Sequence, residues 1–156
     1  MKIELVIVGV DQKGIGANPA PGGSKKFIGF RHRRPILIDD AKGNKAWRNT
    51  VVSQARAQYQ GPPLEGPLRV SYRFYIPRPK SHFGKRGLLP SAPKHHIIRP
   101  DLTKFIRSTE DALTDALIWK DDSQTIEHGP SNKQYAEHSP IKGGLPGAVI
   151  IIETLT

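Results

Sequence analysis

The chain has 156 residues, a net charge of +10 at pH 7 and no cysteine. We expect residues 1–156 to form a single domain, and the absence of cysteine excludes disulfides and cysteine-ligated metal sites. A pI near 10 predicts a polyanionic partner, with nucleic acid favoured over an anionic membrane surface. The apolar runs are too short to cross a bilayer, and the start lacks a signal-peptide pattern, so a cytoplasmic protein without a membrane segment is expected.

The first part of the chain contains a buried strand followed by a basic stretch. Residues Ile3–Val10 are apolar and largely β-branched, which predicts a strand. Lys25–Arg34 interleaves basic residues with Phe27, Ile28 and Phe30, and Pro35–Asp39 has the composition of a strand end. This stretch is either a solvated hairpin or a DNA contact, and the residues alone leave both open. The candidate DNA-binding residues here are Lys25, Lys26, Arg31, Arg33 and Arg34.

A helix is predicted over Asn44–Tyr59, with Asp39 or Asp40 as its cap. Its apolar positions recur every three to four residues, which is typical of one buried helix face. They are Ala46, Trp47, Val51, Ala55 and Tyr59. Trp47 is therefore expected in the core, and the Pro-rich segment 61–67 ends the helix because proline cannot continue it.

The middle of the chain pairs a regular strand with a long basic loop. Leu68–Ile76 alternates apolar with polar or basic residues, which predicts a strand with one buried and one basic face. Pro77–Arg99 is a long loop, and loops of this length in a compact domain are usually functional or disordered. We expect it to be mobile without ligand and to contact DNA. Its candidate DNA-binding residues are Arg78, Lys80, Lys85, Arg86 and Lys94.

The last third is predicted to contain a helix, two strands and a second loop. Pro100 suits the first turn of a helix that runs to about Leu117. Its inner stripe is Leu102, Phe105, Ile106, Thr109, Leu113, Ala116 and Leu117, and its polar stripe is Lys104, Arg107, Ser108, Asp111 and Asp115. Strands are predicted over Ile118–Glu127 and Gly147–Leu155, with a loop over His128–Pro146. Interleaved strands and two main helices predict an α+β fold, one sheet with helices on one face.

Acidic residues are concentrated in Arg99–Glu127, which holds seven of the 14 in the chain, directly after a basic segment, 71–100, that has none. Asp101 starts the predicted helix, and Asp122 lies on the predicted strand that follows. Carboxylates that converge from two elements repel each other unless a cation lies between them. Mg²⁺ takes few protein carboxylates and keeps waters, which suits phosphodiester hydrolysis. Alternatively, Asp101 only favours the helix start, and Asp121 and Asp122 only form a turn.

Two further features bear on the chemistry. Arg107 lies about two turns after Asp101, where it could stabilise a phosphoryl transition state or form an i,i+4 ion pair with Asp111. The six histidines show no metal-binding spacing such as HExxH. Because Asp121 and Asp122 are neighbours on a predicted strand, they cannot both face one site.

The segment from Arg99 to Gln124 reads R-P-D-L-x-K-x-x-R-x-x-x-D-A-L-T…W-x-D-D-S-Q. It resembles the RusA family of crossover-junction endodeoxyribonucleases, the Holliday junction resolvases of phages and prophages. The resemblance implies a homodimeric, mixed α+β protein of DNA recombination and repair. It also implies paired symmetric nicks in four-way junctions with Mg²⁺ or Mn²⁺, metal binding by Asp101 and Asp122, and catalytic support from Arg107. Asp111 matches the helix Asp of the family motif.

One position departs from the family pattern. The family places a second carboxylate two residues after the first, where this chain has Thr103, so Asp111 or Asp121 would have to help hold the metal or turnover would be reduced. The leading hypothesis is a metal-dependent, structure-selective endonuclease with Asp101, Asp122 and Arg107 as catalytic residues and Lys104 near the scissile phosphate. The alternatives are a catalytically impaired junction-binding protein and a general nucleic-acid-binding module.

Overall fold

The computed structural model describes residues 1–11, 13–23, 25–39 and 43–156. Its main sheet has the strands β1 (Lys2–Val8), β4 (Leu68–Ile76), β7 (Thr125–His128), β8 (Asn132–Tyr135) and β9 (Gly147–Thr154). The order is β1-β9-β4, and β4 then pairs with both β7 and β8. The first three strands are antiparallel, whereas β7 and β8 run parallel to β4. This mixed sheet confirms the predicted α+β class.

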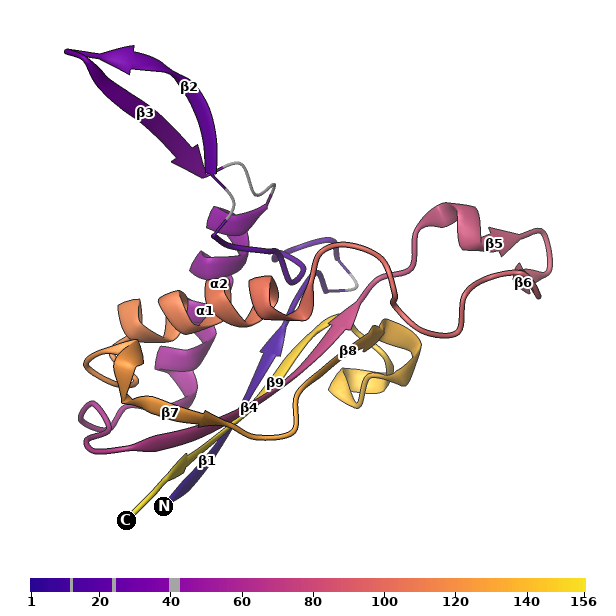
Figure 1. The fold of residues 1–156 in the computed structure, drawn as a ribbon. Coiled ribbons are helices and arrows are strands. Elements are labelled where there is room, and N and C mark those ends of the chain that lie inside the picture. Colours follow the sequence, from indigo (N-terminus) through magenta and orange to yellow (C-terminus); the bar gives the residue numbers. More distant parts are fainter. Residues whose placement is uncertain (12, 24, 40–42) are drawn as a thin grey trace.

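Two helices, α1 (Asn44–Gln58) and α2 (Leu102–Asp115), cover one face of this sheet (Figure 1). The alternation predicted for β4 places Val70, Tyr72 and Phe74 beneath them, each with no exposed surface. The Phe105 ring of α2 packs on Phe74 at 5.4 Å between centroids. Trp47 of α1 is fully buried, as predicted, and its indole Nε1 donates to Thr109 Oγ1 of α2 at 3.1 Å. The helices are therefore tied to each other as well as to the sheet.

The opposite face of the sheet has a smaller apolar cluster. Tyr75, Val149 and Ile141 pack together there. Ile141 belongs to the short helix η4 (Ile141–Gly143), which lies in the segment before β9. Tyr75 lies on the face of β4 that was predicted to be basic, and Arg69 on that same face is neutralised by Glu127 and Glu153. Of the two arginines on this face, Arg69 is thus neutralised, whereas Arg73 is exposed, so the predicted basic face is confirmed only in part.

The outer edge of β1 is closed by two glutamine side chains from α1. Gln54 accepts from the Val8 amide and donates to its carbonyl, both at 2.7 Å. Gln58 does the same for Val6, at 2.9 and 2.8 Å. The side-chain amides therefore reproduce the hydrogen bonds that a neighbouring strand would make.

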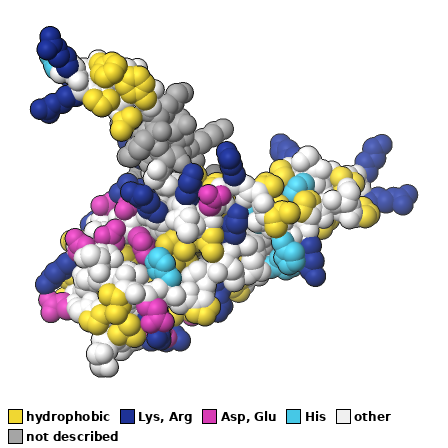
Figure 2. Space-filling view, viewed as in Figure 1, with side chains coloured by type: hydrophobic (Ala, Val, Ile, Leu, Met, Phe, Trp, Pro, Cys, Tyr) yellow, Lys and Arg dark blue, Asp and Glu magenta, His cyan; other side chains and the backbone are white. Residues whose placement is uncertain are grey.

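Two hairpins project from the body. One is formed by β2 (Lys25–Arg31) and β3 (Arg34–Asp39), and the other by β5 (Phe83–Gly84) and β6 (Gly87–Leu88) after the short helix η1 (Lys80–His82). Figure 1 shows them extending in different directions, and Figure 2 shows Lys and Arg gathered at the end of each. In the described ranges, no helix has the length and apolar character needed to span a membrane.

Several local predictions are wrong at helix ends and faces. The N-cap residue of α1 is Gly43 and not Asp39, and no side chain caps this helix end. The other predicted cap, Asp40, lies outside the described residues. Ala46 is exposed although it was placed on the apolar face. Ser108 was placed on the polar stripe of α2, but it is fully buried because its hydroxyl donates to the Ala20 carbonyl. Pro100 precedes the N-cap residue Asp101 instead of entering the helix.

The predicted strand over Ile118–Glu127 is also wrong, because α2 ends in a tight reversal. Leu117 adopts a left-handed conformation with φ 55°, and its amide bonds to Thr114 O while the Ile118 amide bonds to Leu113 O. These two bonds form a Schellman motif. They leave Leu117 57% exposed rather than in the inner stripe. The short helix η2 (Asp122–Gln124) follows, and only Thr125–His128 is strand.

The predicted loop over His128–Pro146 likewise contains regular structure. It holds β8 and two short helices, η3 (Ala136–His138) and η4. The parallel pairing of β8 with β4 runs from Arg73 to Ile76. Because β8 has polar residues at three of its four positions, NKQY, no apolar alternation marked it as a strand.

Candidate active site

The D-D-S-Q segment builds a compact turn that separates the roles of its two aspartates. Asp121 is the N-cap residue of η2, and its Oδ1 accepts a hydrogen bond from the Ser123 amide at 2.8 Å. Hydrogen bonds from Ser123 lower the pKa of the Asp121 carboxyl. Gln124 completes the capping box through the Asp121 amide and donates to the Leu64 carbonyl. With Asp121 and Gln124 holding the turn, Asp122 is directed toward α2.

A hollow of about 320 Å³ lies between α2, η2 and β7. Thr103, Arg107 and Glu110 border it from α2 at steps of four and three residues, so one helix face supplies all three. The full lining is Thr103, Ile106, Arg107, Glu110, Asp111, Asp122 and His128. The hollow therefore joins cationic, acidic and hydrogen-bonding groups that are far apart in sequence.

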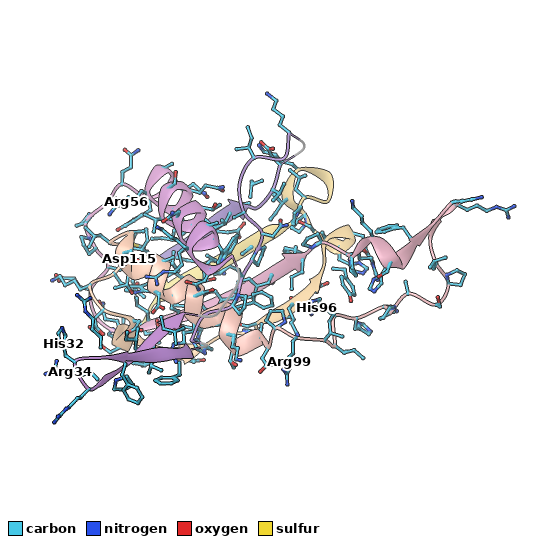
Figure 3. The ribbon with its side chains drawn as sticks, turned by 90° about the horizontal axis from the view of Figure 1, so that it is seen from above. His32, Arg34, Arg56, His96, Arg99 and Asp115 are labelled. Carbon is cyan, nitrogen blue, oxygen red and sulfur yellow. The ribbon has the colours of Figure 1, made fainter. Side chains whose placement is uncertain are left out.

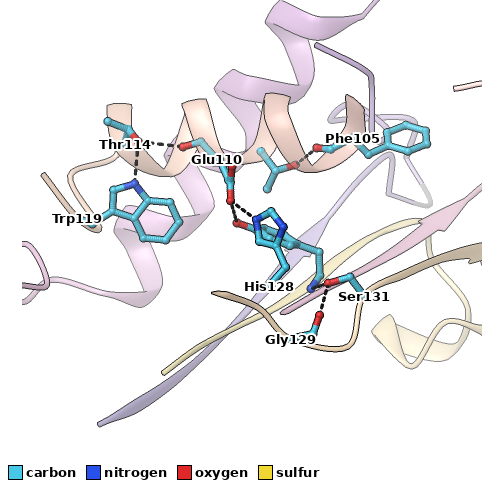
Figure 4. Close-up of polar contacts among 9 residues, drawn as sticks. Phe105, Glu110, Thr114, Trp119, His128, Gly129 and Ser131 are labelled. Atoms are coloured by element: carbon cyan, nitrogen blue, oxygen red, sulfur yellow. Dashed lines mark hydrogen bonds and ion pairs between the residues drawn. The ribbon is translucent and has the colours of Figure 1, made fainter. Parts of the chain in front are cut away.

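Glu110 links the buried sheet to this hollow. Its Oε1 accepts from the Tyr72 hydroxyl at 3.1 Å and lies 2.8 Å from His128 Nε2 (Figure 4). Burial, chiefly, and the nearby Glu110 charge raise the pKa of the Tyr72 hydroxyl, so this group stays protonated and remains a donor. The Glu110 carboxylate is thus held in one orientation by a buried phenol and an imidazole.

The register break between β7 and β8 fixes His128. Ser131 Oγ accepts from the Tyr72 amide at 3.0 Å and donates to the Gly129 carbonyl at 2.9 Å (Figure 4). A side chain at residue 129 would place its Cβ 2.2 Å from Ser71 Oγ. A larger residue here would therefore displace the Ser71 hydroxyl, and glycine leaves it in place. The break sets the position from which the His128 ring reaches Glu110 and packs edge-on against Tyr72, with 5.9 Å between centroids.

Asp111 lies in a divided electrostatic environment. Burial raises the pKa of its carboxyl, the Arg48 and Arg107 charges lower it, and the Asp122 charge raises it again. Arg48 is 4.0 Å from Asp111 and 2.7 Å from Asp115. Because the Arg107 charge lowers the pKa of Asp111, Arg107 favours the ionised form of this carboxyl. No hydrogen bond or ion pair between Arg107 and Asp111 accompanies this effect in the described part of the chain.

The carboxylate oxygens in the hollow are the type of ligand that a hard divalent cation prefers. After burial, the Asp122 charge contributes to the raised pKa of the Asp111 carboxyl, and a cation between the two carboxylates would relieve their repulsion. Within the ranges that the structure describes, no three or more His, Asp or Glu side chains are gathered closely enough to hold a metal together. Two carboxylates suffice for Mg²⁺ when substrate phosphate supplies further oxygens, so the donor set fits a metal that binds together with DNA.

Asp101 lies at the N-cap of α2, without a side-chain cap bond. Lys133 of β8 holds the preceding backbone, since its Nζ donates to the Ile98 carbonyl at 2.7 Å and the Pro100 carbonyl at 2.8 Å. The Asp101 charge in turn raises the pKa of Lys133, although burial of the lysine outweighs it and the net shift is downward. The Asp101 carboxylate is thus near a fixed ammonium group at the entrance to α2.

The structure brings only some of the predicted site residues together. Asp122, Arg107 and Asp111 share the hollow, whereas neither Asp101 nor Asp121 is among the described residues that line it. Lys104 is exposed on α2 and takes part in an electrostatic or polar contact.

The predicted DNA-binding residues are distributed over both projections. The side chains of Lys25 and Lys26 lie outside the described part of the chain. Arg34 is at the tip of the β2–β3 hairpin (Figure 3), which stands away from the body (Figure 1). The exposed members are Arg31, Arg33, Arg34, Lys80, Lys85, Arg86 and Lys94.

Arg78 has a different position from the other predicted DNA-binding residues. Its side chain is only 3% exposed and pairs with Glu137. The guanidinium also donates to the Pro93 carbonyl and lies 3.9 Å above the Tyr135 ring. These contacts assign Arg78 to anchoring the base of the long loop, because little of its surface remains for a phosphate.

Glu110 and His128 border the hollow but were not predicted as site residues. Glu110 lies seven residues, two helical turns, after Thr103, so helical spacing was a usable signal. His128 gave no comparable signal, since its position depends on the turn at η2 and on the break at Gly129.

The comparisons with known proteins give one result. The family model described as Endodeoxyribonuclease RusA matches residues 20–152. A search of curated proteins gives no match.

Proposed function

Because the chain belongs to the RusA family of endodeoxyribonucleases, we propose that it is a metal-dependent nuclease that resolves four-way DNA junctions by paired symmetric nicks. The observation that carries this proposal is the hollow shared by Asp122, Asp111 and Arg107. It combines two carboxylates, which would hold a metal, with a cationic group, and phosphodiester hydrolysis uses both.

Each site residue has a proposed task. Asp122 and Asp111, which line the hollow, would hold Mg²⁺ or Mn²⁺, and Asp101 at the N-cap of α2 is a further candidate ligand. A metal bound there supplies a polarised water and neutralises charge at the phosphate. Arg107 faces the hollow and is proposed to bind the scissile phosphate, with Lys104 beside it on the same helix. Glu110, held by Tyr72, brings to this helix face a carboxylate that Thr103 does not provide.

The DNA is proposed to follow the two projections. Arg31, Arg33 and Arg34 would contact one part of the backbone, and the exposed cations of the long loop another. Figure 2 shows Lys and Arg at both projecting ends and Asp and Glu gathered on the body. Phosphate contacts of this kind position nucleic acid without reading its sequence, which suits a structure-selective enzyme.

A homodimer is part of the proposal. A four-way junction has two-fold symmetry, so paired nicks require two active sites related by a two-fold axis. Each copy would then cut one of two equivalent strands.

The test is a cleavage assay with a four-way junction and Mg²⁺, compared with linear duplex at equal salt. Nicks at symmetric positions in two opposing strands are expected from wild type. Binding of the junction with no nicks, even in Mn²⁺, would refute the nuclease. Equal affinity for junction and duplex would indicate a general nucleic-acid-binding module.

Thr103 favours a second candidate, a junction-binding protein with impaired catalysis. This residue lines the hollow where the family carries a carboxylate. The variant Thr103→Asp separates the two candidates. A large gain in cleavage at low Mg²⁺ indicates that wild type is impaired, whereas an unchanged or lower rate indicates that other carboxylates already serve the site.

A further inference from the structure

One face of the β2–β3 hairpin is aromatic, and a β-bulge makes it so. Residues three apart on a regular strand point to opposite faces. The register shifts between Phe27 and Gly29, so Ile28 is an extra residue and Phe27 and Phe30 fall on the same face. Their rings are in edge-to-face contact at 5.1 Å between centroids. Leu37 and Pro35 are their cross-strand partners and extend the same face.

This aromatic face is open to solvent. Phe27 is 52% exposed, Phe30 70% and Leu37 56%. A two-stranded hairpin has no second layer to cover its apolar face, and Figure 1 shows the hairpin standing away from the helices and the main sheet. Large exposed apolar patches in soluble proteins usually mark interaction sites.

The tip beyond this face is strongly cationic. His32 and Arg33 form a tight turn, both with positive φ, 50° and 62°. Arg31 and Arg34 are directly opposite each other in the ladder. Like charges at such a position destabilise the pairing. The acidic residue of the hairpin, Asp39, lies at its base opposite Lys25, so none is near the tip, and a phosphate bound there would relieve the repulsion.

We propose that the aromatic face of the β2–β3 hairpin stacks on bases that are left unstacked at the branch point of the junction, while the arginines of the tip bind the flanking phosphates. The proposal rests on the proposed function, because it specifies how that activity selects its DNA. DNA is chosen over a second copy of the chain as the occupant because the cationic tip adjoins the aromatic face. A second copy packed through the same face would bring a hairpin that carries the same positive charge.

The selectivity follows from the state of the bases. In linear duplex each base is already stacked on its neighbours, so insertion of a ring must first separate them, which costs a few kcal/mol. At a branch point the stacking is interrupted, and an aromatic ring can meet a base without that cost. Base–aromatic stacking is independent of sequence. The phenylalanines should therefore contribute to junction binding, and the arginines to binding of every DNA.

The experiment measures affinity for a four-way junction and for linear duplex in Ca²⁺, where binding is read without cleavage, over a series of salt concentrations. Phe30→Ala should weaken junction binding about tenfold, with little change for duplex and an unchanged salt slope. The double variant Arg33→Ala/Arg34→Ala should weaken binding to both DNAs and reduce the salt slope by about one for each phosphate that is no longer neutralised. Phe30→Trp should retain junction binding.

Ile15→Ala is the matched control, since Ile15 is 67% exposed and lies outside the hairpin. It should bind both DNAs like wild type. A 2-aminopurine placed at the branch point should brighten when wild type binds, as it leaves its neighbours, and brighten less with Phe30→Ala. Equal losses for junction and duplex in Phe30→Ala, or no loss at all, would overturn the proposal.

Conversion of Phe30→Ala to a monomer where wild type is a dimer would also overturn it, because the face would then be a subunit interface. Since the Phe30 side chain is exposed, Phe30→Ala is expected to have the same thermal unfolding midpoint as wild type. Phe30→Trp keeps the test decisive if the alanine variant unfolds. If Phe30→Ala cleaves and binds junctions like wild type, the stacking proposal fails while the nuclease stands. If wild type binds junctions with the predicted Phe30 dependence but never nicks them, only the nuclease fails.

Discussion

The coupling between Glu110 and Tyr72 gives a prediction that separates folding from chemistry. Tyr72 has no exposed surface, and its hydroxyl donates to a carboxylate whose side chain is 15% exposed. Glu110→Ala removes a hydrogen bond to a charged group and leaves the phenol buried without a partner. We expect a loss of about 2–3 kcal/mol in the free energy of unfolding.

Removing the hydroxyl as well should restore part of that loss. Tyr72→Phe alone is expected to cost about 1 kcal/mol, but in the Glu110→Ala background it removes the unpaired group. The double variant should therefore be more stable than Glu110→Ala by about 1 kcal/mol. Urea denaturation of the wild type, both single variants and the double variant measures this coupling as a double-mutant cycle.

Glu110→Gln tests the role of the charge in the hollow. Its amide oxygen can still accept from Tyr72, so stability should change by less than about 1 kcal/mol, while junction cleavage should fall at least about tenfold as one negative charge leaves the site. Glu4→Gln on β1 removes the same charge at an exposed position and should cleave normally. The reasoning is refuted if the double variant is less stable than Glu110→Ala, or if Glu110→Gln cleaves like wild type.

Three further predictions concern the surroundings of the site. Asp122→Asn should lower cleavage by orders of magnitude while gel-shift binding of the junction persists; joint loss of binding and folding would instead identify a structural residue. Lys133→Met should release the Ile98 and Pro100 carbonyls and slow cleavage at saturating DNA, with Lys133→Arg recovering part of the rate; equal rates for all three proteins would exclude a positioning role. Arg78 holds the pKa of the Glu137 carboxyl below its ordinary value, so its stabilisation is present above about pH 4.3 and is lost as pH falls through the lowered pKa. The thermal midpoints of wild type and Glu137→Gln should therefore differ most above about pH 5 and converge in acid, and a gap that is constant with pH would contradict this.

The sequence predicted the parts of the fold where periodicity is undisturbed. β4 coincides with the predicted strand Leu68–Ile76, and α1 and α2 differ from prediction by only a few residues at their ends. In each, the apolar residues recur at the period of the element, so one face must be buried. Trp47 was placed correctly for this reason.

The errors arise where a backbone or side-chain bond overrides the pattern. The left-handed Leu117 ends α2 although leucine gives no stop signal, since glycine is the usual residue there. Ser108 is buried because Ala20, 88 residues earlier, supplies its acceptor. The strand β8 is polar and depends on β4 for its pairing. None of these partners can be identified from local sequence.

Some residues of the candidate site were predicted from the sequence and others were missed. Asp122, Arg107 and Asp111 were named and share the hollow. The predicted metal site between Asp101 and Asp122 stays a prediction. Glu110 was missed because the family motif directs attention to the position of Thr103, whereas the helix offers its carboxylate two turns later.

The glutamines on β1 limit how two copies of this chain can associate. A dimer built by continuing one sheet into another needs an outer strand with free amides and carbonyls. At Val6 and Val8 these groups are already bonded to Gln58 and Gln54. Only the end of β1 near Lys2 and Glu4 remains, and both residues are charged and exposed. A two-fold axis in this protein should therefore pass outside the β1 edge, so a cysteine pair engineered across that edge should not cross-link.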